Sequence, residues 1–288
     1  MRRTILAVAA LVAGTAAESC ISGLYMVVAR GTKEPEGAGM TGSVTESIAR
    51  KVPGSQVVPL RYPASLSNPD YQDSVADGVR QMQTTIRDYV KVCPRSKVAV
   101  FGYSQGAHVA MDALCGSSGM AGFGNSTPIG IDLMTKNIVA VVLFGDPSHV
   151  VNVTYDRGTS VRNGIFNRTS SSVQACNAFA DRIVSYCDEG DYYCDRGRKR
   201  TVHSLYMSRY GAEVRRFVVD RFKNATDEQG GAKKHLSSTS RMAAMPTSTA
   251  PPSTSNGGGP GGEGGADRAG QARGSTSSAA SDYRNSRP

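Results

Sequence analysis

Apolar residues along the chain form short continuous runs, separated by longer segments in which they recur every three or four positions. The short runs are rich in β-branched residues and predict buried strands; they lie at 24–29, 56–60, 98–101, 138–144 and 181–186. Helical spacing predicts helices at 42–51, 70–92, 105–114 and 205–222. Because strands and helices alternate, the pattern predicts a parallel, doubly wound α/β sheet.

Both ends of the chain lack this alternation. Residues 1–17 contain two arginines, an apolar run and then small residues, which is typical of a secretory signal peptide cleaved after Ala17. Residues 225–288 are mostly Gly, Ser, Thr, Pro and Ala and predict a disordered tail. Residues 18–224 remain for one domain with a full core. Since no stretch approaches the roughly 20 apolar residues of a spanning helix, we expect a secreted, extracellular monomer with no membrane partner.

Charge and cysteine content narrow the class of protein further. The net charge of +9 falls to +7 without the two arginines of the signal peptide, and most basic residues are scattered, so we expect no nucleic-acid partner. No metal-binding motif is apparent, and we expect neither a metal nor another cofactor. An even number of cysteines in a secreted chain favours three disulfides, with 15 pairings open. The cysteines are Cys20, Cys93, Cys115, Cys176, Cys187 and Cys194, and glycosylation sequons begin at Asn125, Asn152, Asn167 and Asn224.

One strand-to-helix junction carries a motif with a chemical consequence. Residues 102–106 read G-Y-S-Q-G, directly after the strand at 98–101 and at the start of the next helix. This is the pattern of a nucleophile elbow, in which a strained turn exposes the serine at the carboxyl end of the sheet. Glycines two positions before and after the serine allow close packing, and the helix N-terminus favours negative charge. We interpret Ser104 as a nucleophile.

A serine nucleophile needs a general base, which in this architecture follows it and a carboxylate in the chain. His203 fits, because it lies between the last strand and the closing helix. His108 lies on the elbow helix, and we interpret it as a packed or partly exposed helix residue. His149 follows a strand but precedes most candidate carboxylates, and His235 falls in the predicted tail.

The orienting carboxylate is expected in the loop at 187–195. We choose Asp191, because it lies between Cys187 and Cys194, which can close a small ring that holds the loop stiffly. Asp188 and Asp195 are interpreted as solvated loop charges.

The negative charge that forms on the substrate oxygen needs at least two donors. The backbone N–H of Gln105, the residue after the nucleophile, is one. Thr32 lies in the loop after the first strand and offers an N–H and a hydroxyl as the second.

Several segments together resemble the fungal cutinase and acetylxylan esterase family. They are A-R-G-T-K-E at 29–34, G-Y-S-Q-G at 102–106, F-G-D-P at 144–147, C-D-E-G-D-Y-Y-C at 187–194, and His203. The resemblance covers residues 20–222 and implies a serine esterase with no lid, an α/β-hydrolase-like three-layer sandwich around a five-stranded parallel sheet. It implies a triad of Ser104, Asp191 and His203, an oxyanion hole at Thr32 and Gln105, and the disulfides Cys20–Cys93, Cys115–Cys176 and Cys187–Cys194.

Within this family the chain looks closer to the acetylxylan esterases. The segment M-D-A-L-C-G at 111–116, the F-G-D-P turn and the extra pair Cys115/Cys176 resemble that branch. Tyr192 and Tyr193 stand where cutinases tend to carry aliphatic residues. Because tyrosine offers a flat face and a hydroxyl to a sugar ring, we predict that both bind substrate; packing against the loop is the alternative.

The run R-G-R-K-R at 196–200 is more basic than we expect in either branch. It is either a solvated loop or a cluster at the cleft rim that favours acidic substrates, such as xylan bearing glucuronic acid. We predict a secreted serine carboxylic-ester hydrolase that deacetylates acetylated xylan in plant cell walls. Cutin or short-chain aliphatic esters are the alternative substrates, and a non-catalytic secreted binding protein on the same scaffold is the third hypothesis.

Overall fold

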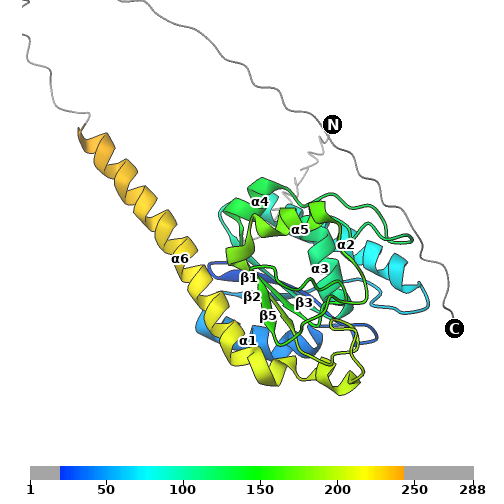
Figure 1. Ribbon diagram of the computed structural model, residues 1–288. Coiled ribbons are helices and arrows are strands. Elements are labelled where there is room, and N and C mark those ends of the chain that lie inside the picture. Colours follow the sequence, from blue (N-terminus) through cyan, green and yellow to red (C-terminus); the bar gives the residue numbers. More distant parts are fainter. Residues whose placement is uncertain (1–19, 243–288) are drawn as a thin grey trace, which may run out of the picture. The chain divides into compact units, whose positions relative to one another are not determined.

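The protein is built around one parallel sheet (Figure 1). The computed structural model describes residues 20–242, with side chains to residue 227; the predicted signal peptide and residues 243–288 lie outside this range. The strand order is β2-β1-β3-β4-β6-β5. The strands are β1 Leu24–Ala29, β2 Gln56–Pro59, β3 Lys97–Tyr103, β4 Ile138–Phe144, β5 Asp156–Gly158 and β6 Ile183–Cys187. The helices are α1 Gly42–Lys51, α2 Tyr71–Val92, α3 Gln105–Cys115, α4 Ile131–Lys136, α5 Ser170–Asn177 and α6 Tyr206–Met242, with 3₁₀ turns at Gly39–Thr41, Ala180–Arg182 and Arg200–Ser204.

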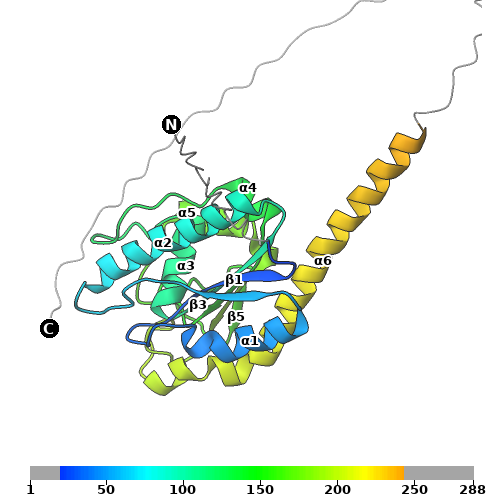
Figure 2. The same ribbon diagram turned by 180° about the vertical axis from the view of Figure 1, so that it is seen from behind.

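Helices cover both faces of the sheet, which gives three layers (Figures 1 and 2). Successive side chains of a strand point to opposite faces. In β3, Val98 and Val100 join the apolar cluster under α2 and α3, whereas Ala99 and Phe101 join the cluster under α1 and α6. The continuous apolar runs of the sequence are therefore strands buried on both sides, as predicted.

The sheet has six strands, so the predicted count of five was wrong. The missed strand, β5, is the tripeptide Asp156-Arg157-Gly158 at the sheet edge beside β6. It contains no apolar residue and is held by backbone pairing with β6, so it leaves no hydrophobic pattern. The last predicted strand was also placed early, because residues 180–182 form a 3₁₀ turn before β6 begins at Ile183.

The closing helix is longer than predicted. It was expected to end at Phe222, but α6 continues to Met242 and includes residues that composition assigned to the tail. Residues 223–242 have few apolar residues and hence no helical periodicity, although they include helix formers such as Ala225 and Ala232. The side chain of His235 lies outside the described residues. Among the helices within residues 20–242, none combines the length and the apolar character needed to cross a membrane.

Three disulfides cross-link the domain. They are Cys20–Cys93, Cys115–Cys176 and Cys187–Cys194, the pairs implied by the family resemblance. The first joins the segment before β1 to the end of α2, and the second joins α3 to α5. The third joins two cysteines that are 7 positions apart in the sequence, on either side of Asp191. Because all strands are parallel, their carboxyl ends lie at one edge of the sheet, and the loops after β1, β3, β4 and β6 meet there.

Candidate active site

Ser104 occupies a strained turn between β3 and α3. Its φ of 54° and ψ of −120° lie in a region that residues other than glycine rarely adopt. The neighbouring glycines permit the turn, since a Cβ on Gly106 would lie 2.0 Å from the carbonyl oxygen of Ala29. The Ser104 N–H donates to the carbonyl of Phe144 in β4 at 2.9 Å. The predicted elbow is therefore present, with its serine at the carboxyl edge of the sheet.

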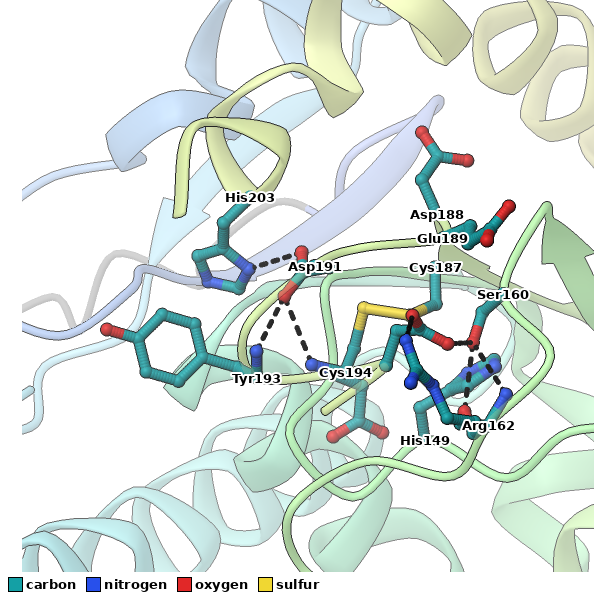
Figure 3. Close-up of a disulfide and its surroundings, with 12 residues drawn as sticks. His149, Ser160, Arg162, Cys187, Asp188, Glu189, Asp191, Tyr193, Cys194 and His203 are labelled. Atoms are coloured by element: carbon teal, nitrogen blue, oxygen red, sulfur yellow. Dashed lines mark hydrogen bonds and ion pairs between the residues drawn. A yellow bond between two sulfur atoms is a disulfide. The ribbon is translucent and has the colours of Figure 1, made fainter. Parts of the chain in front are cut away.

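His203 connects Ser104 to Asp191. Its Nε2 lies 2.9 Å from Ser104 Oγ. Its Nδ1 lies 2.8 Å from Asp191 Oδ2, a contact shown in Figure 3. The ring sits in the Arg200–Ser204 turn, where the Tyr103 hydroxyl donates to the His203 carbonyl at 3.0 Å. Gly145 lies so close beneath the ring that a Cβ there would be 2.7 Å from His203 Cε1.

Asp191 is fully buried and accepts several hydrogen bonds. Besides His203, the donors are the Tyr206 hydroxyl at 2.6 Å and the N–H groups of Tyr193 at 2.7 Å and Cys194 at 3.1 Å. Burial alone would raise the pKa of Asp191, but the hydrogen bond and charge of His203, with the bonds from Tyr206 and Tyr193, hold this pKa below its usual value. The carboxylate therefore stays ionised and can orient the His203 ring.

Asp188 and Asp195, the carboxylates on either side of Asp191, help to fix its loop. The sequence led us to expect both in solvent. Instead, Asp195 is buried and accepts from Arg162 at 2.8 Å, Ser160 at 2.7 Å and the Gly190 N–H at 2.7 Å (Figure 3). Asp188 is buried too and accepts from the Tyr210 hydroxyl at 2.6 Å. These partners, together with the Cys187–Cys194 disulfide, secure the loop from several directions.

The two predicted oxyanion donors, Gln105 and Thr32, come from two separate segments of the chain. Gln105 begins α3, and its buried side chain is held by Ser65 and Ser74, with Nε2 2.7 Å from the Ser65 carbonyl oxygen. Only its backbone N–H is thus available to a substrate oxygen. Thr32, in the loop after β1, lines the same cleft as Ser104.

The cleft over Ser104 has a volume of about 450 Å³. Its lining consists of Thr32, Lys33, Leu66, Tyr71, Gln72, Tyr103, Ser104, Pro147, Ile165, Phe166, Tyr193, Arg200 and His203. Of the two predicted substrate tyrosines, Tyr193 belongs to this lining, with its ring centroid 4.6 Å from that of His203. Tyr192 does not; its ring lies 4.5 Å from the Arg200 guanidinium and is 40% exposed.

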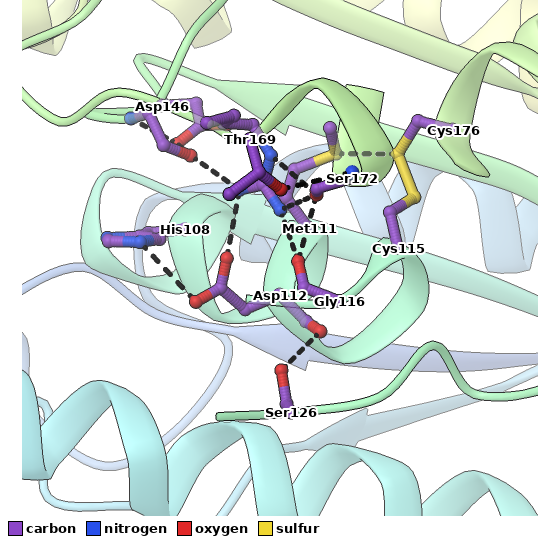
Figure 4. Close-up of polar contacts among 12 residues, drawn as sticks. His108, Met111, Asp112, Cys115, Gly116, Ser126, Asp146, Thr169, Ser172 and Cys176 are labelled. Atoms are coloured by element: carbon purple, nitrogen blue, oxygen red, sulfur yellow. Dashed lines mark hydrogen bonds and ion pairs between the residues drawn. A yellow bond between two sulfur atoms is a disulfide. The ribbon is translucent and has the colours of Figure 1, made fainter. Parts of the chain in front are cut away.

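The remaining histidines with described side chains are buried and do not line the cleft themselves. His108 was expected to be packed or partly exposed and is completely buried; Nδ1 is 3.3 Å from the Tyr71 hydroxyl, and Nε2 is 3.6 Å from Asp112 (Figure 4). Burial lowers the pKa of His108 to about 3, so the ring is neutral. His149 lies 3.1 Å from Asp156 and 3.3 Å from Ser185 Oγ.

The basic run at 196–200 does not form one surface. The Arg196 side chain is exposed and is tied down locally, donating to the Gly164 carbonyl at 2.8 Å and to Asn167 Oδ1 at 2.9 Å. Arg200 lines the cleft. Arg198 and Lys199 are exposed and lie outside the cleft lining.

The family model for cutinase matches residues 19–222. The chain is 30% identical over 201 residues to acetylxylan esterase 2 of Talaromyces purpureogenus, covering 68% of this chain and 85% of that protein. It is 31% identical over 225 residues to cutinase 11 of Verticillium dahliae, covering 74% of each. A solved structure of an acetylxylan esterase superposes with a TM-score of 0.64 at 28% identity, over 71% of this chain and all of that one. The resemblance predicted from the motifs is confirmed: the chain belongs to the cutinase family, a family of carboxylic ester hydrolases.

Proposed function

We propose that the protein is a secreted serine esterase that removes acetyl groups from acetylated xylan. The observation that carries this proposal is the contact chain from Asp191 through His203 to Ser104, with the serine on a strained turn at the cleft. The signal-peptide pattern of residues 1–17 and the three disulfides support secretion.

The contact chain supplies the parts of an acyl transfer. His203 Nε2 takes the proton from Ser104 Oγ as that oxygen attacks the carbonyl carbon of the ester. Asp191 holds Nδ1–H and stabilises the imidazolium that forms. The N–H of Gln105 and the Thr32 donors bind the oxyanion, each worth about 3 kcal/mol in the transition state. His203 then protonates the leaving alcohol, and water hydrolyses the acyl-serine by the same route.

An acetylated sugar polymer is favoured by the similarity to acetylxylan esterases and by the aromatic rings in the cleft. Tyr71 and Tyr193 line it, and the flat face of a tyrosine ring suits a sugar ring. Burial is the largest of the causes that raise the pKa of Tyr71, so its hydroxyl stays protonated beside Nδ1 of the buried His108, 3.3 Å away, and its ring is the part left to contact a sugar.

A second candidate is hydrolysis of longer aliphatic esters such as cutin. It is favoured by two apolar side chains in the cleft lining, Leu66 and Ile165, which remain 53% and 37% exposed. Large exposed apolar side chains beside a reactive serine suit an acyl chain. Their loops have no apolar periodicity, so no local pattern indicated their place in the cleft.

Acetate release from acetylated xylan, compared with hydrolysis of acetyl, butyryl and longer 4-nitrophenyl esters, separates these functions. We expect activity on acetylated xylan and the highest kcat/KM on the acetyl ester, both lost in Ser104→Ala. A preference for butyryl or longer chains would favour the second candidate. Ester hydrolysis that persists in Ser104→Ala would refute the serine mechanism, and a wild type inactive on every ester would favour the non-catalytic binding protein.

A further inference from the structure

The cleft around Ser104 contains two cations and no carboxylate in its lining. Lys33 and Arg200 line it, and neither forms an ion pair within the part of the chain that the structure describes. The nearest acidic neighbour of Lys33 in sequence is already engaged: Glu34 accepts from the N–H groups of Gly31 and Met40. The cleft lining therefore presents to its substrate two cations that form no ion pair among the described residues.

Each cation is attached to a fixed part of the site. Arg200 begins the 3₁₀ turn that carries His203, and its guanidinium lies 4.5 Å from the centre of the Tyr192 ring. This stacking holds the guanidinium while leaving its N–H groups free for a ligand. Lys33 follows Thr32, and the backbone N–H of Lys33 donates to the Ala64 carbonyl at 2.8 Å.

The position of Arg200 indicates which half of the ester it meets. His203 protonates the leaving alcohol in an acyl transfer of this kind, so the alcohol lies on the His203 side of the cleft. Arg200 belongs to the same short turn as His203 and lines the same cleft, which places it near the alcohol half. Arg198, two residues earlier, is exposed but lies outside the lining, which makes it a matched control for a change of charge.

We propose that Arg200 recognises a carboxylate on the glycan that carries the acetyl group, with Lys33 adding longer-range attraction, so that the preferred substrates are acetylated glycans bearing uronic acid. A planar guanidinium binds a carboxylate through two parallel N–H donors. This inference rests on the proposed function, because it concerns the alcohol half of the same ester. It also narrows the hypothesis drawn from residues 196–200 to Arg200.

The test compares acetylated xylo-oligosaccharides with and without a glucuronic acid substituent. In Arg200→Gln the ratio of kcat/KM for the acidic over the neutral substrate should fall by about three- to fivefold, as for a solvent-accessible ion pair. Arg200→Lys, which keeps the charge but lacks the two parallel donors, should keep only part of the preference, and Arg198→Gln should keep the wild-type ratio. Raising the salt concentration from about 0.01 M to about 1 M should lower the wild-type ratio.

Equal ratios in the wild type and Arg200→Gln, or an equal fall in Arg198→Gln, would overturn the inference. A binding measurement tests this inference independently of the proposed esterase activity. Calorimetry on Ser104→Ala should show tighter binding of a xylo-oligosaccharide bearing glucuronic acid than of its neutral counterpart, and the difference should shrink when Arg200→Gln is added. Equal binding of the two would refute the anion preference, whereas failure of the wild type to hydrolyse any ester would refute the esterase itself.

Discussion

A single methyl group at Gly145 tests whether the placement of His203 controls activity. Gly145 follows β4 with a φ of +60°, directly beneath the ring. In Gly145→Ala the new Cβ would lie 2.7 Å from Cε1 and 2.8 Å from Nδ1 of His203, whereas an ordinary contact begins at 3.4 Å. The ring or the backbone must therefore move by about 0.7 Å.

That movement is large compared with the tolerance of the contact to Ser104. The Nε2–Oγ distance is 2.9 Å, and a separation of about 3.6 Å is no longer a hydrogen bond. Since a misplacement of about 1 Å can cost about 10²-fold in rate, we expect kcat/KM on 4-nitrophenyl acetate to fall by about 100-fold. Strain from alanine at positive φ should lower the free energy of unfolding by about 1–2 kcal/mol.

Gly130→Ala is the matched control. Gly130 also has a positive φ, +114°, but no heavy atom lies within 4 Å of the position that a Cβ would take there. This variant should lose stability in urea unfolding while keeping kcat/KM within about twofold of the wild type. Retention of more than half of the wild-type kcat/KM in Gly145→Ala, or an equal loss of activity in Gly130→Ala, would refute control by the His203 placement.

Three further predictions concern the Asp191 loop and the cleft. Replacing Cys187 and Cys194 with alanine should lower the free energy of unfolding by about 2 kcal/mol and reduce kcat/KM, measured by urea unfolding and 4-nitrophenyl acetate hydrolysis; unchanged kcat/KM would show that the ring does not position Asp191. Burial would raise the pKa of Asp195, but Arg162 and the other donors hold this pKa below its usual value. The ionised Asp195 therefore stabilises the fold at any pH above the pKa that it has in the unfolded chain, and this stabilisation is lost as the pH falls through its pKa in the folded protein. Asp195→Asn should therefore cost about 1–3 kcal/mol at neutral pH, and in urea unfolding across pH the gap to the wild type should close below about pH 4; a constant gap would contradict this. Leu66→Ala should lower the butyryl-to-acetyl ratio of kcat/KM by about threefold, and an unchanged ratio would exclude Leu66 from the acyl site.

Local sequence requirements account for the parts of the site that could be predicted. The turn at Ser104 needs small neighbours at fixed positions, so the G-x-S-x-G pattern identifies it, and the order of serine, acid and histidine then selects His203. Helix α2 was predicted from its apolar face, and Asp70 caps it by accepting from the Asp73 N–H at 2.9 Å.

The other features depend on partners far away in the chain. Asp195 has the composition of a loop charge, and its burial follows from Arg162, 33 residues earlier. Leu66 reaches the cleft because its loop folds beside the elbow. Strand β5 is defined by backbone pairing alone. None of these produces a local pattern, so the sequence predicted the reacting residues better than the walls of the cleft.

Covalent labelling of Ser104 tests the central claim most directly. The protein is incubated with an aryl phosphonate ester, and intact-mass and peptide mass spectrometry locate the adduct. We predict one adduct per chain, on Ser104, none in Ser104→Ala, and much slower labelling in His203→Gln and Asp191→Asn because the serine loses its base or the base loses its orientation. Labelling at another residue, or labelling of Ser104 at the wild-type rate in His203→Gln, would contradict the proposed triad.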